Sequence, residues 1–418
     1  MPDERQTLKS LFDKAVEAAQ AEHLIPGRLP PQPPGRTLVL GAGKAAAAMA
    51  HTVENNWSGE LSGLVITPYG HAAPCDRIEV VEAAHPIPDE TGCDAAHRIL
   101  TMAAELGEED LAVCLLSGGG SALMPLPAEG LTLQDKQSIT NGLLKCGANI
   151  AEINCVRRHL SAIKGGRLAA ACSPARIATL AISDVPGNEV SSMASGPTVA
   201  DATTSAMALD ILNRYNLVVP DNVMKHLQSA AAETLKPGDP AFDNASFEIL
   251  ATSDDALQAA AALARELGIE AVVLGDLQGD AAELGRDHAA MAKQAAMATQ
   301  AAPCVLISGG ETTVQVRGRG RGGRNSEYCL ALALALDGHP GIYAIACDTD
   351  GIDGTEDNAG CLITPDSLQR ASVNSLDARK LLNENDSYRF FSEIGDLVET
   401  GPTRTNVNDF RAILITSV

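Results

Sequence analysis

The sequence predicts two α/β domains, each with helices on both faces of a central sheet, and a binding cleft between them. The chain has 418 residues, which is more than one hydrophobic core usually organises. Short apolar runs typical of buried strands alternate with alanine-rich segments that have helical periodicity. Two of these runs, 111–116 and 305–307, end in a Ser-Gly-Gly sequence. Open α/β sheets bind ligands at the C-terminal ends of their strands, so we expect each domain to contribute one such loop.

The two glycine loops are the first candidate binding elements. They comprise Ser117, Gly118, Gly119, Gly120 and Ser121 in the first half, and Ser308, Gly309, Gly310 and Glu311 in the second. Glycine leaves backbone N–H groups accessible to a bound anion. For either copy alone, an ordinary strand-ending turn is an equally good interpretation.

Composition restricts the class of protein. The chain has 53 acidic and 31 basic residues, a formal net charge of −22, which argues against non-specific binding to nucleic acid. No apolar run approaches the ~18 residues of a membrane span, and the charged N-terminus does not resemble a signal peptide. The ten cysteines are scattered singly, and several, such as Cys114, Cys304 and Cys347, lie in apolar runs. We therefore expect a cytoplasmic monomer or homodimer that binds small molecules through local basic clusters.

The first strand leads into a glycine turn that carries a lysine. An amphipathic helix (7–22) and a proline-rich connector (26–35) precede the strand 37–40. The turn Gly41-Ala42-Gly43-Lys44 then opens the helix beginning at Ala45. It fits part of the Rossmann dinucleotide pattern G-x-G-x-x-A, but the next strand (61–67) does not end in the acidic residue that binds the ribose. It lacks the upstream glycine and the Ser/Thr of a P-loop. The remaining interpretation is a helix N-terminus that presents Lys44 to a phosphate or carboxylate, with a solvent-exposed lysine as the alternative.

The rest of the first half contains a basic segment and a strand-end carboxylate. The basic segment 154–167 includes Lys164. It follows a strand (77–82), His85 before a proline, and two helices, one beginning at 89 and one with its N-cap at Thr132. This segment is either an anion pocket or a solvated helix face. The strand 177–183 ends in Asp184, a position that suits a Mg²⁺ ligand. The segment 236–240 is the expected linker between the domains.

The second half begins with a repeated strand–helix pattern. We expect strands at 247–252 and 271–274, helices at 254–267 and 281–301, and a strand–turn–strand at 305–316. The alternation of strands and helices predicts parallel pairing. The Arg-Gly run 317–324 resembles an RNA-binding RGG segment. In an acidic chain, between two ordered elements, it fits a mobile phosphate clamp or lid better.

Two polar segments follow. The strand 343–347 ends in Asp348-Thr349-Asp350, which begins like a calcium-binding EF-hand loop but has Ala359 at the position of the required glutamate. We therefore assign these carboxylates to the phosphates or ribose of a nucleotide. The loop 400–409, which includes Asn406 and Asn408, is rich in donors that could close over a small polar ligand.

Taken together, these segments resemble the glycerate kinases whose C-terminal half is the MOFRL domain. The resemblance covers nearly the whole chain, and the motifs occur in one order. They are Gly41–Lys44, Leu116–Ala122, Arg158–Ser161 with Lys164–Arg167, Ser183–Val185, Ala194–Thr198, Ser308–Thr312, Gly323–Glu327, Asp348–Gly351 and Thr405–Asp409. Asn188 and Arg404 depart from the family pattern, where Asp and a small polar residue are usual.

The resemblance implies an activity, an architecture and a set of cofactors. It implies phosphorylation of D-glycerate with ATP and Mg²⁺, in most bacterial members to 2-phosphoglycerate, and an essential lysine that matches Lys44. It also implies a Rossmann-like glycerate kinase domain (1–240) and a MOFRL domain (241–418), with the active site between them. Members are often labelled hydroxypyruvate reductase. An NAD(P)H-dependent reductase and a non-enzymatic sugar-acid-binding protein therefore stay as alternatives.

The candidate site residues fall into three groups. Catalysis is assigned to Lys44, Arg324 and Asp184, and metal binding to Asp184 and Asp350, either of which could instead orient the substrate hydroxyl. Substrate or nucleotide binding is assigned to Gly41, Gly43, Ser117, Gly118, Gly119, Gly120, Ser121, Lys164, Ser308, Gly309, Gly310, Glu311, Asn325, Asp348, Asn406 and Asn408.

Overall fold

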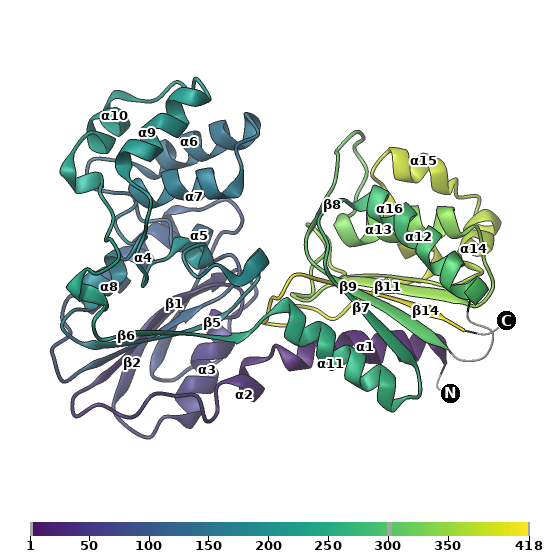
Figure 1. Ribbon diagram of the computed structural model, residues 1–418, viewed down its shortest axis with the longest axis horizontal. Helices are drawn as coiled ribbons and strands as arrows, with labels where there is room; N and C mark the ends of the chain where they lie inside the picture. The colour runs from purple at the N-terminus through teal and green to yellow at the C-terminus, as the bar shows by residue number, and fades with distance from the viewer. Residues whose placement is uncertain (1–2, 299–302, 417–418) are drawn as a thin grey trace. The chain divides into compact units, whose positions relative to one another are not determined.

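The computed structural model describes residues 3–298 and 303–416, which form two compact units (Figure 1). Leu24–Leu250 form the N-terminal unit, and the described residues of Met1–His23 and Ala251–Val418 form the C-terminal unit. The first helix, α1 (Glu4–Ala18), packs against helix α11 and strand β14 of the C-terminal unit. The units thus differ from the predicted ranges 1–240 and 241–418 chiefly in this helix.

A six-stranded sheet forms the centre of the N-terminal unit. Its strand order is β3-β2-β1-β4-β5-β6, and the pairs among β1 to β5 are parallel. The strands are β1 (Thr37–Ala42), β2 (Leu61–Pro68), β3 (Ile78–Ala83), β4 (Leu111–Leu116), β5 (Arg176–Ile182) and β6 (Ala245–Ala251). Every residue of β1 and β4 is buried, as the continuous apolar runs predicted. The prediction that residues 247–252 begin the second sheet was wrong, because they belong to β6 at the edge of this sheet.

Helices cover both faces of this sheet and also form a separate cluster (Figure 1). Helix α3 (Ala46–Asn56) lies on one face, and α4 (Glu90–Ala103), α5 (Gly120–Leu123) and α8 (Arg167–Cys172) lie on the other. The cluster, with its own apolar core, contains α6 (Leu133–Lys145), α7 (Ile150–His159), α9 (Ser205–Arg214) and α10 (Asp221–Leu227). Short helical turns occupy Ala21–Leu24 (α2), Pro186–Asn188, Met193–Ser195, Ala230–Ala232 and Pro240–Phe242.

The N-cap predicted at Thr132 is confirmed. The Thr132 hydroxyl accepts a hydrogen bond from the backbone N–H of Asp135 at 3.1 Å, and the Asp135 carboxylate accepts one from the backbone N–H of Thr132 at 2.9 Å. Because this capping box satisfies two donors at the helix end, it sets where α6 begins.

The C-terminal unit has a mixed sheet with strand order β13-β12-β11-β14-β9-β7. The strands are β7 (Glu270–Asp276), β9 (Cys304–Gly309), β11 (Ile342–Asp348), β12 (Gly360–Ile363), β13 (Leu397–Val398) and β14 (Asp409–Ile415). The predicted parallel pairing is confirmed for β7 and β9. It does not extend to β11, β12, β13 and β14, whose pairs are antiparallel. The chain returns from β11 to β12 through a short loop, and a parallel pair would need a longer crossover.

Residues 311–316 do not fold back on β9 as predicted. Strand β10 (Thr312–Thr313) instead pairs with β8 (Gly279–Asp280) in a small separate sheet. Helices α1 and α11 (Ser253–Glu266) cover one face of the main sheet (Figure 1). The other face is covered by α12 (Ala281–Ala298), α13 (Arg324–Leu336), α14 (Ser367–Val373), α15 (Ala378–Asn383) and α16 (Ser387–Ile394). The predicted end of the helix at Ala301 lies outside the described residues.

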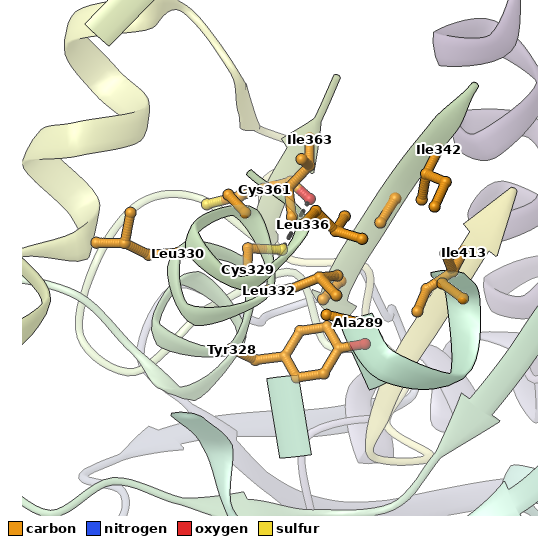
Figure 2. Close-up of a cluster of buried hydrophobic side chains, with 14 of the residues drawn as sticks. Ala289, Tyr328, Cys329, Leu330, Leu332, Leu336, Ile342, Cys361, Ile363 and Ile413 are labelled. Carbon is orange, nitrogen blue, oxygen red and sulfur yellow. Dashed lines mark hydrogen bonds between the residues drawn. The ribbon is translucent and has the colours of Figure 1, made fainter. Parts of the chain in front are cut away.

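The core of the C-terminal unit lies between α13 and the sheet (Figure 2). Tyr328, Leu332 and Leu336 of α13 are buried in the same cluster as Ile342 of β11 and Ile413 of β14. The ten cysteines all lie among the described residues and form no disulfide there, and the three named from the sequence are buried. In the part of the chain that the structure describes, no helix combines the length and the apolar character needed to cross a membrane.

A buried histidine in this core makes stability depend on pH. His288 of α12 is 2% exposed, and its Nδ1 lies 2.7 Å from the Tyr328 hydroxyl. Burial, with a smaller contribution from Arg411 and against the opposing effect of Asp287, lowers the pKa of His288 from 6.5 to about 4. As the pH falls through 6.5 towards 4, His288 becomes protonated in the unfolded chain but stays neutral in the native state. The native state is therefore destabilised on the acid side.

We expect this single group to remove about 2 kcal/mol of stability between about pH 7.5 and pH 5. The measurement is the free energy of unfolding in urea at both pH values for the wild type and for His288→Gln. The variant should lose about 2 kcal/mol less than the wild type, because the contributions of all other groups cancel in the comparison. Equal losses in the two proteins would show that His288 is not held neutral.

Candidate active site

Two loops of the N-terminal unit interlock at the C-terminal edge of its parallel sheet. The backbone N–H of Lys44 donates to the carbonyl of Gly118 at 2.8 Å, and that of Ala45 donates to the Ser117 hydroxyl at 2.9 Å. In the other direction, the backbone N–H of Ser117 donates to the carbonyl of Ala42 at 3.3 Å. The lysine turn after β1 and the glycine loop after β4 therefore form one structural element.

The glycines of the lysine turn are required by packing within the protein. Gly43 has a φ of 146°, and a Cβ atom there would lie 2.1 Å from the Ser117 hydroxyl oxygen. A Cβ atom at Gly41 would lie 2.1 Å from the carbonyl oxygen of Leu115. These contacts explain why the two loops can approach each other so closely.

The N–H groups of the lysine turn are already used. Those of Lys44 and Ala45 bind the glycine loop, as described above, and those of Gly43 and Ala46 donate to the carbonyls of Ile66 and Gly43 at 3.0 and 3.1 Å. Residues 43–46 of the turn therefore leave no backbone N–H group for a ligand. Any interaction of Lys44 with an anion has to come from its half-buried side chain.

The glycine loop after β4 does offer donors. In the described part of the chain, the backbone N–H groups of Gly118, Gly119 and Ser121 have no protein acceptor. Gly119 has a φ of 80°, and a Cβ atom there would lie 2.8 Å from Nε2 of His85, so this histidine lies against the loop. Successive N–H groups in such a turn form a concave site for an anion.

Lys164 binds this loop through hydrogen bonds to backbone carbonyls. Its Nζ donates to the carbonyls of Ser121 at 2.9 Å and Ala194 at 3.4 Å, and the side chain is 1% exposed. The hydroxyls of Ser121 and Ser195 are 2.8 Å apart, and residues 194–196 all have positive φ. The sequence suggested that Lys164 lies near backbone N–H groups, whereas its ammonium group lies near carbonyls. Asp184 lies two residues after β5 and is half-buried.

The basic segment 154–167 is neither a single anion pocket nor a solvated face. Arg158 pairs with Asp201 at 3.0 Å, and both side chains are buried. The guanidinium of Arg167 donates to backbone carbonyls of residues 231–233. Only Arg157 and Lys164 of this segment remain as candidates for binding a ligand.

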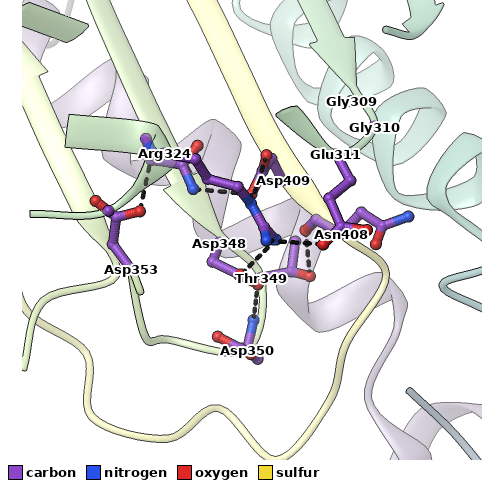
Figure 3. Close-up of polar contacts among 12 residues, drawn as sticks. Gly309, Gly310, Glu311, Arg324, Asp348, Thr349, Asp350, Asp353, Asn408 and Asp409 are labelled. Carbon is purple, nitrogen blue, oxygen red and sulfur yellow. Dashed lines mark hydrogen bonds and ion pairs between the residues drawn. The ribbon is translucent and has the colours of Figure 1, made fainter. Parts of the chain in front are cut away.

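In the C-terminal unit, three carboxylates surround Arg324, the first residue of α13 (Figure 3). Its Nε donates to Asp409 at 2.8 Å, and its two terminal nitrogens donate to Glu311 at 2.9 Å and Asp348 at 2.8 Å. Burial alone would lower the pKa of Arg324, but the three carboxylates raise it, so the side chain stays charged. Arginine has five N–H donors, of which these bonds use three, so two remain for a ligand.

Asp409 and Arg411 connect Arg324 to the second glycine loop. Asp409 also accepts hydrogen bonds from the Asn325 amide at 2.8 Å and from Arg411 at 2.6 Å. Arg411, 1% exposed, donates to the carbonyls of Gly309 at 2.7 Å and Gly310 at 3.2 Å. Sequence reasoning missed Arg411. The available signal was a charged residue between Phe410 and Ala412 in an apolar strand, where a buried charge needs a partner.

The second Ser-Gly-Gly loop is anchored by contacts within its own unit. Gly310 has a φ of 89°, and the carbonyl of Gly309 accepts from the N–H of Leu277 at 3.0 Å as well as from Arg411. A Cβ atom at Gly309 would lie 2.6 Å from the Ser253 hydroxyl oxygen. The second loop, which begins at the buried Ser308, is thus tied to its own unit through its carbonyls.

Asp353 is a second residue that sequence reasoning missed. Its carboxylate accepts hydrogen bonds from the backbone N–H groups of Asn325 at 2.9 Å and Ser326 at 2.8 Å, and it is 1% exposed. Burial raises the pKa of Asp353. Because this carboxylate occupies the N-terminus of α13, it positions the turn that carries Arg324.

The other predicted polar residues fix two loops to each other. The carboxylate of Asp348 accepts from the N–H of Asp350 at 3.0 Å. The carbonyl of Asn408 accepts from the Thr349 hydroxyl at 2.6 Å, and the amide oxygen of Asn406 accepts from the N–H of Asn408 at 3.2 Å. These groups tie the end of the loop 400–409 to the loop after β11. Among the described residues, no group of three or more His, Cys, Asp and Glu side chains is arranged as a metal site.

The Arg-Gly run packs against residues 384–388. The N–H of Gly320 donates to the carbonyl of Glu384 at 2.9 Å, and that of Tyr388 donates to the carbonyl of Arg321 at 3.0 Å. A Cβ atom at Gly318 would lie 2.1 Å from the same Glu384 oxygen. The guanidinium of Arg321 lies 4.5 Å from the centre of the Tyr388 ring. The structure therefore shows a docked segment where the sequence suggested a mobile lid.

Comparison with known proteins identifies the family. Residues 7–228 match the model described as a domain of unknown function, DUF4147, and residues 304–409 match the MOFRL family. A D-glycerate 2-kinase from Thermotoga maritima is 37% identical over 404 residues, which cover 96% of this chain and 95% of the relative. The chain belongs to the MOFRL family. This confirms the resemblance seen in the motifs.

Two further comparisons extend this result for the MOFRL-family protein. The crystal structure of a glycerate kinase from Thermotoga maritima superimposes with a TM-score of 0.89 at 36% identity, covering 99% of each chain. A relative from Agrobacterium vitis, provisionally named a hydroxypyruvate reductase, is 50% identical over 98% of this chain and 94% of its own length. The names of the relatives thus point to two activities.

Proposed function

We propose that this MOFRL-family protein is a cytoplasmic glycerate kinase that transfers the γ-phosphoryl group of ATP to D-glycerate and forms 2-phosphoglycerate and ADP. The observation that carries the proposal is the loop after β4, with the unpartnered N–H groups of Gly118, Gly119 and Ser121 beside the Lys44 turn. The glycerate kinases among the relatives support the choice of substrate.

The chemistry explains why this loop matters. The substrate hydroxyl oxygen attacks the γ-phosphorus, the bond from that phosphorus to the β-phosphate oxygen of ADP breaks, and the hydroxyl proton passes to a carboxylate or to water. Phosphoryl transfer depends on positioning and on neutralising charge, because there is little covalent work for the protein to do. Both substrates are anions, and the chain carries a net charge of −22, so they need local donors and cations. The loop supplies backbone donors, and Lys44 supplies a cation.

Arg324 and the strand-end carboxylates complete the proposal. The two N–H groups that Arg324 leaves unused can donate to a phosphate or carboxylate, while Asp409 and Asp348 fix the orientation of the guanidinium. Mg²⁺ usually keeps several waters and binds one or two carboxylates together with the phosphates of the substrate. Asp184 and Asp350 suit this mode because each carboxylate follows the C-terminal end of a strand. That both units serve one reaction stays a prediction.

The name of the relative from Agrobacterium vitis favours a second candidate, an NAD(P)H-dependent hydroxypyruvate reductase. The local geometry argues against it. A dinucleotide needs backbone donors from the first strand–helix turn and an acid at the end of the next strand. Here the N–H groups of residues 43–46 are used within the protein, and β2 ends in Thr67-Pro68 followed by Tyr69.

Two assays on the wild type separate these functions. With D-glycerate and MgATP, a coupled assay should detect ADP in proportion to the glycerate consumed. With hydroxypyruvate and NADH or NADPH, the absorbance of the nicotinamide should stay constant. Oxidation of the nicotinamide without ADP formation would establish the reductase instead, and binding of glycerate without either turnover would establish a sugar-acid-binding protein.

A further inference from the structure

A cavity of about 270 Å³ lies in the N-terminal unit between residues 86–88 and helix α6. Ser121 lies in its wall, so it adjoins the loop with the unpartnered N–H groups. Gln137 of α6 donates to the carbonyl of Pro88 at 2.8 Å and holds the two walls together. The volume is close to the lower end of the range of about 300–1,000 Å³ that is typical of small-molecule sites.

The cavity is strongly basic in an acidic protein. Three cationic side chains line it, those of Lys136, Arg157 and Lys164, and the described residues in its wall include no Asp or Glu. The whole chain has 53 acidic and 31 basic residues, so a wall with three cations and no carboxylate differs strongly from the composition of the chain. The cationic lining of the cavity favours an anionic ligand.

The three cations have no carboxylate partner among the described residues. Lys136 is 7% exposed, and its Nζ donates only to the carbonyl of Leu126 at 3.2 Å, while Lys164 binds two carbonyls. Burial, with smaller contributions from Arg157 and Arg167 and against the opposing effect of Cys93, lowers the pKa of Lys136 to about 7. Burial also lowers the pKa of Lys164, with Lys136 and Arg157 acting in the same direction. A buried charge without a partner is costly, and a bound anion would remove that cost.

The remainder of the wall is apolar, which restricts the kind of anion. Ile87 and Leu144 line the cavity although they are 71% and 56% exposed, and Pro125 and Leu133 continue the apolar surface. D-Glycerate carries an oxygen on every carbon, so it has no apolar face to place against these side chains. A nucleotide has both a flat base and a chain of phosphates. The side-chain amide of Asn141 and the hydroxyl of Thr140 add polar groups that can contact the edge of a base.

We propose that this cavity is the nucleotide site, with the base between Ile87 and Leu144 and the phosphates directed towards Lys136, Lys164 and the loop at Ser121. The inference rests on the proposed function, because it names where the phosphoryl donor of that reaction binds. The site for the hydroxy acid lies elsewhere. The cavity contains residues such as Lys136 and Leu144 that the motifs did not single out.

The main test is calorimetric binding of MgADP and, separately, of D-glycerate to the full-length chain. Lys136→Met removes the charge and keeps most of the volume, and Lys145→Met is the matched control, an exposed lysine on the same helix. Lys136→Met should weaken ADP binding by at least about 10-fold and leave the affinity for D-glycerate unchanged. Lys145→Met should change neither.

A second measurement is the uptake of a proton when ADP binds. An anion beside Lys136 raises the pKa of this amine, so ADP binding near pH 7.5 should take up a proton. The measured binding enthalpy should then vary with the ionisation enthalpy of the buffer, and this variation should be smaller in Lys136→Met.

A substitution at the exposed rim of the cavity separates an effect on binding from an effect on folding. Leu144→Glu places an acid at the mouth of the cavity, and Ile150→Glu places the same acid at another exposed apolar position, 65% exposed, outside the cavity. Leu144→Glu should weaken ADP binding by about 10-fold with normal melting, and Ile150→Glu should not.

Two results would overturn the inference. Unchanged ADP binding in both Lys136→Met and Leu144→Glu would remove the cavity from nucleotide binding. Loss of D-glycerate binding with ADP binding retained would assign the cavity to the hydroxy acid. Failure of the proposed function looks different. In that case the wild type forms no ADP from ATP and D-glycerate, and ADP binding that depends on Lys136 still locates a nucleotide site.

Discussion

Replacement of Lys44 by alanine is expected to lower the turnover number by about 10²–10³-fold without unfolding the protein. The backbone of Lys44 stays bonded to Gly118 in the variant, because that hydrogen bond does not involve the side chain. Under the proposed function, what is lost is a cation on the turn that binds the glycine loop, and this cation would offset negative charge that develops during phosphoryl transfer. The measurement is kcat and KM for D-glycerate and ATP in the ADP-coupled assay, together with a melting curve.

Lys14→Ala on helix α1 is the control for Lys44→Ala. The Lys14 side chain is 41% exposed and pairs only with Glu17 at 3.1 Å, an exposed pair that contributes little to stability. Its turnover should match that of the wild type. If Lys44→Ala kept near-normal turnover with normal melting, Lys44 would be a turn residue without a catalytic role.

The second large effect is on stability. Arg411→Met should lower the free energy of unfolding by about 2–3 kcal/mol, because the buried Asp409 carboxylate loses one of its two arginine partners and keeps only Arg324 as a cation. The carbonyls of Gly309 and Gly310 each lose one donor in the same variant and keep the backbone N–H groups of Leu277 and Asp409. Urea unfolding followed by circular dichroism measures the loss.

Arg389→Met on α16 is the matched control for this variant. The Arg389 side chain is 60% exposed, and its carboxylate partner Asp386 lies 4.0 Å away, so the loss should stay within about 0.5 kcal/mol. A loss of less than about 1 kcal/mol for Arg411→Met would show that the network around Asp409 does not hold the second glycine loop.

The local features of the fold were the most predictable from sequence. The apolar runs of β1 and β4 identify buried parallel strands, and the capping residue Thr132 sets the start of α6. The glycine loop after β4 is also readable, because strand, glycine and helix follow one another within a few residues. In each case the signal and the structure it determines lie within one short segment.

Long-range partners were not predictable in the same way. The periodicity of α1 shows which of its faces is buried, but it does not show that the partners are β14 and α11, far along the chain. Strand β6 has the same type of sequence whether it joins the first sheet or the second. The short strand β12 carries little pattern of its own, so the antiparallel part of the C-terminal sheet was missed.

The site was predictable to the extent that its chemistry lies in motifs. Lys44, Arg324 and the Ser117–Ser121 loop stand out through residue type and local context. Asp353 and Arg411 act by holding other residues, and only the three-dimensional contacts reveal that role. The basic cavity was missed for the same reason, since Lys136 and Lys164 come from different segments.

The most direct test of the central claim is phosphorus NMR of the product that the wild type forms from D-glycerate and MgATP. The account predicts the signals of ADP and of a phosphate ester on the 2-hydroxyl, in equal amounts. A phosphate ester on the 3-hydroxyl would correct the position of transfer. The absence of any new phosphate ester, with hydroxypyruvate reduced by NADH or NADPH in a parallel sample, would contradict the assignment as a kinase.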